Sequence, residues 1–73
     1  MTKVMINYEQ EVLSVDGEIL PIVYWSRGPN ANCTLREAWG CVAGPTKDGE
    51  WIVQPLGDYT IGYDVEIVST PLH

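Results

Sequence analysis

Two Asp-Gly pairs, Asp16-Gly17 and Asp48-Gly49, constrain the fold of this chain more than any other feature. Asp-Gly readily adopts the positive φ angles of a tight hairpin turn. The first pair separates residues 11–15 from residues 18–25, and the second precedes Trp51–Gln54. These flanking segments are rich in Val, Ile, Tyr and Trp, which are frequent in β-strands. We therefore expect short strands joined by at least two tight turns.

Alternation of side chains predicts two further strands. Residues 3–8 alternate apolar and polar positions, and residues 63–68 do so with Asp64 and Glu66 on one outward face. Residues 19–25 are apolar on both faces, as in a central strand. Pro21 lacks the N–H that a ladder needs, so an edge position or a bulge is expected there.

The stretch from Thr34 to Pro45 carries the signals of a short helix. Thr34 and Glu37 have the spacing of a capping box, and Gly44-Pro45 supplies a stop. Gly40 weakens a helix by about 1 kcal/mol. We predict a short helix whose apolar stripe is formed by Leu35, Ala38, Trp39 and Val42.

A strand is the alternative for the same stretch. Trp39, Cys41 and Ala43 would then share one face, and the strand would pair with Trp51–Gln54 through the second Asp-Gly turn. With the helix, the fold is α+β: an antiparallel sheet of about five short strands with one short helix. The alternative is an all-β, SH3-like barrel. We expect a single globular domain over residues 1–69 and a flexible C-terminal tail over residues 70–73.

The charge balance excludes several functions. Ten Asp and Glu residues stand against four Lys and Arg residues, for a formal net charge of −6. Such a charge repels phosphate backbones, so no direct nucleic-acid binding is expected. The single histidine is His73, so the body of the domain lacks the usual proton-transfer residue. Cys33 and Cys41 are too few for a closed zinc site. We expect no catalytic residues, no metal and no cofactor, and therefore no enzyme.

The N-terminal residues Met-Thr-Lys-Val-Met do not resemble a secretory signal. The longest apolar run covers residues 19–25, whereas a membrane span needs about 20 residues. A cytoplasmic protein that does not enter the membrane is expected, with both cysteines reduced.

Two groups of residues are candidates for binding a partner protein. If the first and last strands are neighbours, four carboxylates share a face that would steer the domain toward a basic partner: Glu9, Glu11, Asp64 and Glu66. Arginine and tryptophan dominate interface energetics, and the loop at residues 28–32 is flanked by such residues, namely Trp25, Arg27 and Arg36.

The chain resembles the small, acidic, single-domain proteins with which phages redirect host machinery. In length and charge it is similar to the transcription regulator of lytic Xanthomonas phages, and the stretch from Thr34 to Trp39 is similar to a helix start in another phage polymerase inhibitor. The resemblance implies a monomeric regulator that binds host RNA polymerase, inhibits initiation and permits antitermination. It transfers no binding residue to this sequence.

Two other functions remain open from the sequence. The carboxylates could imitate phosphates and block a nuclease, CRISPR or restriction complex, although ten are few for such a mimic. The chain could also be an assembly component of a larger particle, which predicts self-association.

Overall fold

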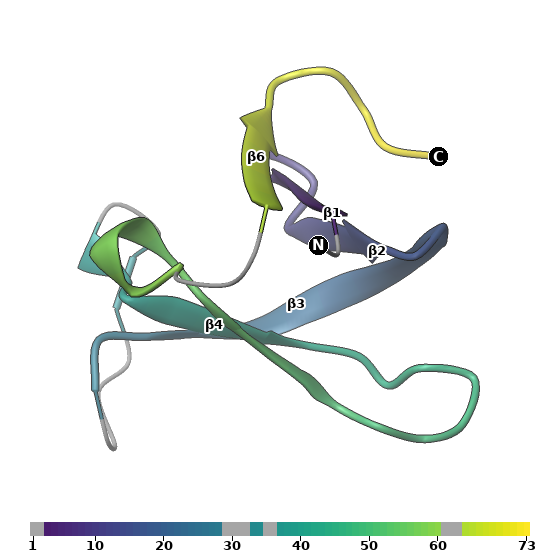
Figure 1. Ribbon diagram of the computed structural model, residues 1–73, viewed down its shortest axis with the longest axis horizontal. Coiled ribbons are helices and arrows are strands. Elements are labelled where there is room, and N and C mark those ends of the chain that lie inside the picture. The colour runs from purple at the N-terminus through teal and green to yellow at the C-terminus, as the bar shows by residue number, and fades with distance from the viewer. Residues whose placement is uncertain (1–2, 29–32, 35–36, 61–63) are drawn as a thin grey trace.

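The computed structural model describes residues 3–28, 33–34, 37–60 and 64–73. Half of these residues belong to β-strands (Figure 1). The strands and one 3₁₀ helix follow in the order β1 (Lys3–Asn7), β2 (Val12–Val15), β3 (Glu18–Ser26), β4 (Gly40–Ala43), β5 (Ile52–Pro55), η2 (Gly57–Tyr59) and β6 (Asp64–Val68).

The six strands form one curled sheet in the order β5-β4-β3-β2-β1-β6. β1 to β5 are a meander in which neighbours are antiparallel, whereas β6 is parallel to β1. The long strand β3 joins the two halves, because its first half pairs with β2 and its second half with β4. In Figure 1 β1, β2 and β6 accordingly lie above β3, and the connection from β4 to β5 extends below it.

The predicted α+β fold is wrong, because residues 40–43 form a strand and not a helix. Cys41 and Ala43 point into the core while Gly40 and Val42 point outward, which is the period of a strand. Pairing with β3 on one side and β5 on the other satisfies the backbone and overrides the helical signals. The structure is of the all-β class that the sequence left as its alternative.

The sheet also differs from the prediction in its strands. It has six strands and not five, and it is mixed because β6 is parallel to β1. The alternation predicted for residues 63–68 places Asp64 and Glu66 outward as expected, but Ile67 is exposed as well. Tyr63 lies outside the described residues.

Both Asp-Gly pairs form turns as predicted. Asp16 and Gly17 have φ angles of 50° and 80°, which are the two positive values that a type I′ hairpin requires. Gly49 has a φ of 82° in the longer connection between β4 and β5. There the Gly49 amide donates to the Thr46 carbonyl oxygen at 2.9 Å.

The core lies on one face of the curled sheet. Its buried residues come from alternate positions of β1 to β4 and from the segment before η2: Val4, Ile6, Leu13, Leu20, Ile22, Trp25, Cys41, Ala43 and Leu56. Directly opposite pairs such as Ile6 with Leu13 and Leu13 with Leu20 tie neighbouring strands together within this cluster.

A β-bulge in β3 changes which residues reach the core. Ile22 lies opposite Ala43 and Tyr24 lies opposite Val42, so Val23 is the extra residue. Ile22 and Trp25 therefore both point inward although they are three positions apart. Pro21 precedes the bulge at the point where β3 changes partner, which agrees with the predicted bulge although β3 is a central strand.

Asn7 joins the end of β1 to the C-terminal segment. It is buried, its side-chain amide donates to the Thr70 carbonyl oxygen at 2.8 Å, and its Oδ1 accepts from the Gln10 amide at 2.9 Å. The Leu72 amide also donates to the Gln10 side chain at 2.7 Å. The flexibility expected of residues 70–73 stays a prediction, but these contacts give the segment defined partners.

Asn7→Ala is expected to lower the free energy of unfolding by about 1–3 kcal/mol, because it removes a buried side chain and its two part-buried hydrogen bonds. Urea titration followed by tryptophan fluorescence measures the change. Gln10→Ala removes only exposed side-chain contacts and is expected to cost about 0.5 kcal/mol or less. Equal losses in the two variants would show that burial at Asn7 contributes nothing.

Candidate functional site

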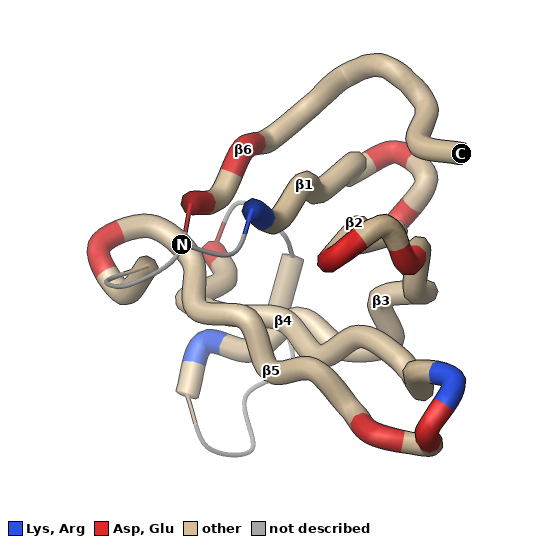
Figure 2. Tube along the Cα trace, turned by 45° about the vertical axis from the view of Figure 1, so that its right-hand side comes forward, with Lys and Arg blue, Asp and Glu red and all other residues tan. Residues whose placement is uncertain are grey.

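The four carboxylates predicted to share a face are divided between the two ends of β1. Because β6 is parallel to β1, Asp64 lies opposite Lys3 and Glu66 lies opposite Met5, near the start of β1. Glu9 and Glu11 follow the other end of β1, beyond the last pair of the ladder. Figure 2 shows the acidic positions dispersed along the trace and not gathered in one row.

The acidic residues of β6 also have a cationic neighbour. The Lys3 ammonium lies 3.1 Å from the Glu66 carboxylate. This hydrogen bond, the charge of Glu66 and the charge of Asp64 raise the pKa of Lys3, in that order of importance. The end of the sheet at β6 is therefore less negative than its two carboxylates suggest.

The predicted aromatic and arginine cluster is only partly available to a partner. Trp25 is buried and packs edge-to-face on Tyr8, with ring centroids 5.8 Å apart. Arg27 is exposed and lies 3.9 Å from the Glu37 carboxylate. Arg36 lies outside the described residues. Among these candidates, Arg27 is exposed and Trp25 contributes to the core.

A different group of aromatic residues is open to solvent, on the outer face of β3, β4 and β5. Tyr24, Val42 and Val53 lie directly opposite one another across the three strands and form one row of this face. Ser26, Gly40 and Pro55 form the next row. The two rows are part of the lining of a groove of about 300 Å³, which we call the aromatic groove.

Trp39 and Tyr59 complete the aromatic groove. Their rings stack with centroids 5.7 Å apart and an angle of 30° between planes. Trp39 is 48% exposed, Tyr59 is 56% exposed and Val53 is 68% exposed, so the apolar lining faces water. Exposed apolar side chains in such a concentration are typical of interaction sites.

Hydrogen bonds fix the backbone on which the two rings stand. The Trp39 amide donates to the Ser26 carbonyl oxygen at 2.8 Å, and the Leu56 amide donates to the Trp39 carbonyl oxygen at 2.8 Å. The Leu56 side chain is anchored in the core, and Leu56 also accepts a hydrogen bond from the Tyr59 amide at 3.2 Å. The backbone at both rings is therefore fixed by bonds within the chain, and the rings contact each other, which lowers the entropic cost of binding.

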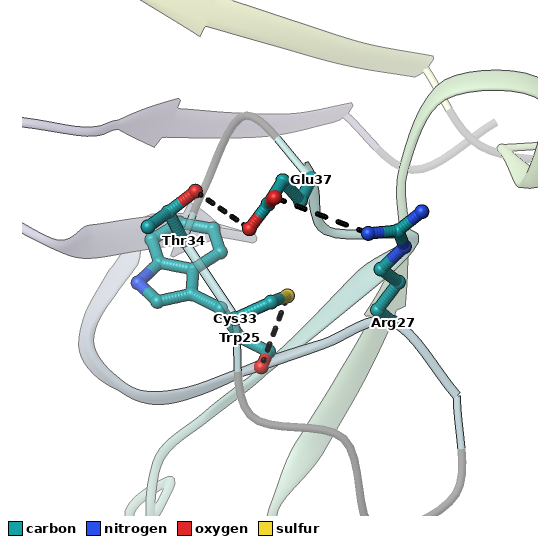
Figure 3. A network of polar contacts seen from close by, with 5 residues as sticks. All are labelled: Trp25, Arg27, Cys33, Thr34 and Glu37. Carbon is teal, nitrogen blue, oxygen red and sulfur yellow. Dashed lines mark hydrogen bonds and ion pairs between the residues drawn. The ribbon is translucent and has the colours of Figure 1, made fainter.

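A polar network supports the segment that leads into Trp39 (Figure 3). The Thr34 hydroxyl lies 3.2 Å from the Glu37 carboxylate, whose other oxygen faces Arg27. The Cys33 thiol donates to the Trp25 carbonyl oxygen at 3.6 Å. Thr34 and Glu37 do interact as the capping-box spacing suggested. Residues 37–39 nevertheless do not form an α-helix, and β4 begins at Gly40.

Close approach of two strands favours glycine at one point in the groove. A Cβ at Gly40 would lie 3.2 Å from the Gln54 carbonyl oxygen, so a larger residue would push β4 and β5 apart. Gly40, which weakened the predicted helix, is thus explained by the close approach of two strands.

Of the two cysteines, Cys41 is buried and Cys33 is half-buried. Cys41 is 1% exposed, and burial raises the pKa of its thiol to about 12, so it is neutral at physiological pH. Within residues 3–28, 33–34, 37–60 and 64–73, no three His, Cys, Asp or Glu side chains are grouped to hold a metal ion. The helical segments in the same ranges are too short or too polar to cross a membrane.

Comparison with known proteins gives no further assignment: no protein family, curated protein or solved structure matches this chain.

Proposed function

We propose that this chain is a protein-binding regulator that contacts its partner through the aromatic groove. The stacked pair Trp39 and Tyr59 is the observation on which the proposal rests, because both rings are anchored at the backbone and open to solvent. Tryptophan and tyrosine are the side chains that contribute most at protein interfaces.

The net charge favours a basic partner. A charge of −6 raises the rate at which the domain meets a positively charged surface. Bacterial RNA polymerase is the specific partner we propose, with the chain acting as a phage-encoded regulator in the host cytoplasm. By occupying a surface of the polymerase it would inhibit initiation or permit antitermination.

The alternative of a nucleic-acid mimic receives less support. All ten carboxylates lie in the described residues, and they are spread over both hairpin turns, the turn after β1, the start of β3, the segment before β4, η2 and β6 (Figure 2). A mimic needs carboxylates spaced like phosphates along one face, and β6 carries only Asp64 and Glu66 beside Lys3.

Trp39→Ala is expected to weaken binding to purified bacterial RNA polymerase by about thirtyfold or more, which corresponds to the loss of an interface hot spot of about 2 kcal/mol. Biolayer interferometry with core enzyme and holoenzyme measures the dissociation constants. Promoter-directed transcription in the same preparations should be inhibited by the natural chain and much less by the variant.

Trp51→Ala is the matched control. Trp51 is 54% exposed and lies outside the groove lining, so its loss should leave polymerase binding within about twofold. Absence of binding by the natural chain would reject the polymerase as partner. Equal binding by Trp39→Ala and the natural chain would reject the groove as the contact surface.

A further inference from the structure

The aromatic groove offers its occupant a largely apolar surface, and two polar side chains of its lining, Ser26 and Gln54, are engaged within the protein. The Ser26 hydroxyl donates to the Gly28 carbonyl oxygen at 3.0 Å and accepts from the Gly28 amide at 3.2 Å. The Gln54 side chain is buried and donates to the Pro55 carbonyl oxygen at 2.8 Å. A ligand that needs many new hydrogen bonds would therefore lose those it makes with water.

The apolar character of the groove favours some backbone conformations of a bound peptide over others. An added β-strand takes its backbone hydrogen bonds from a sheet edge, whereas the groove lies on the face of β3, β4 and β5. A polyproline II segment has no internal hydrogen bonds and keeps its backbone solvated. Proline also has no N–H that burial would leave unpaired.

The arrangement of the lining suits such a segment. Polyproline II has three residues per turn, so every third side chain returns to the same face about 9 Å further on. The lining offers two apolar sets for successive contacts, the stacked rings of Trp39 and Tyr59 and the row of Tyr24, Val42 and Val53. Grooves lined by aromatic side chains bind proline-rich segments in this way.

A carboxylate next to the groove lining indicates that the bound segment also carries a basic residue. Asp58 precedes Tyr59 in η2 and is exposed, and no ion pair joins Asp58 to a cationic side chain in the part of the chain that the structure describes. A Lys or Arg of the ligand can meet this carboxylate while the net charge of −6 attracts it from a distance. The same charges oppose single-stranded nucleic acid, which also stacks on exposed rings.

We infer that the aromatic groove binds an extended, proline-containing segment of the partner protein, in the polyproline II conformation, with a neighbouring Lys or Arg that pairs with Asp58. This inference rests on the proposed function, because it names the chemistry of the segment that a protein-binding groove would recognise.

The test is selection from a display library of random peptides on the immobilised full-length chain, with Trp39→Ala as the counter-selecting surface. The expected result is a consensus with two prolines three positions apart and an adjacent Lys or Arg. The enriched peptide, measured by calorimetry, should bind Trp39→Ala at least about tenfold more weakly and Trp51→Ala normally. Equal thermal stability of the two variants excludes misfolding as the cause.

Two charge-reversal variants test whether a Lys or Arg of the bound peptide pairs with Asp58. Asp58→Lys should weaken the enriched peptide by about fivefold at low salt, whereas Asp48→Lys, with the same net charge in the turn between β4 and β5, should not. Three results would overturn the inference: no enrichment, a consensus without proline, or oligothymidylate competing for the groove at physiological salt.

Failure of the inference can be told apart from failure of the proposed function. If Trp39→Ala loses polymerase binding while the selected peptides lack proline, the groove remains the contact surface and the predicted segment is wrong. If proline-containing peptides bind but the polymerase does not, the chemistry of the groove stands and the partner is wrong.

Discussion

Leu13→Ala is expected to lower the free energy of unfolding by about 2–5 kcal/mol, the range for removing a fully buried leucine side chain. Leu13 has no exposed surface, and it lies between Ile6 on β1 and Leu20 on β3 in the middle of the sheet. A domain of 73 residues has a total stability of about 4–11 kcal/mol, so the loss is a large share of it. The substitution should raise the unfolded fraction by about thirtyfold or more.

Urea titration of the natural chain and the variant, followed by tryptophan fluorescence, measures this loss. Val23→Ala is the matched control, because Val23 is the exposed bulge residue of β3 and its truncation opens no cavity. A change within about 0.5 kcal/mol is expected there. Similar losses at Leu13 and Val23 would mean that the core is not on the face of the sheet described above.

The parts of the fold that could be predicted from the sequence are those decided by neighbouring residues. Asp16-Gly17 forms its hairpin because two successive positive φ angles are accessible to that dipeptide locally. β1 is equally local, since Val4 and Ile6 recur at the period of a strand and form its buried apolar face.

The segment at residues 40–43 could not be assigned in this way. Thr34 and Glu37 have capping spacing and do interact, but a local cap is compatible with a single turn as well as with a helix. The decision comes from β3 and β5, which flank β4 and take up its backbone hydrogen bonds. Those partners are distant in sequence, and local signals carry no information about them.

The candidate site was harder to predict than the fold. The proposed acidic face needed β6 beside β1, which is the case, but also a strand direction that brings Asp64 and Glu66 next to Glu9 and Glu11. The parallel direction of β6 separates them. Strand direction depends on the path between β5 and β6, which residue patterns do not define.

The aromatic groove was missed because exposure of a tryptophan is a tertiary property. Both interpretations of the sequence placed Trp39 on an apolar face, as part of the helical stripe or in line with Cys41 and Ala43. In the structure Trp39 precedes β4, and its ring meets Tyr59 of η2. The available signal was compositional: seven Tyr and Trp residues and no Phe, a choice of rings suited to surfaces that are partly wet.

Stability is expected to fall steeply in alkali because of Cys41. Burial raises the pKa of its thiol from 9.0 to about 12 in the folded chain. Between these values the unfolded chain releases this proton and the folded chain keeps it, so the unfolded state is favoured as pH rises. The contribution of Cys41 to stability is intact below pH 9 and declines by up to about 1.4 kcal/mol per pH unit above it. The total loss approaches about 4 kcal/mol near pH 12.

Tyr8 also makes the folded chain less stable as pH rises. Its burial, and secondarily the nearby Cys41, raise the pKa of its phenol above the usual 10.0, so its contribution to stability is also lost as pH rises. Tyr8→Phe removes this part of the alkaline loss and leaves the part that begins near pH 9 and belongs to Cys41.

Urea midpoints measured under reducing conditions from about pH 7 to about pH 11 give the profile, and cysteine variants assign it. Cys41→Ala should be less stable at neutral pH, because it removes buried volume, but its stability should change much less above pH 9. Cys33→Ala leaves the buried Cys41 in place and should keep the part of the slope that belongs to Cys41. A natural chain whose stability is constant between pH 9 and about pH 11 would contradict the burial of Cys41, and with it the inward face of β4.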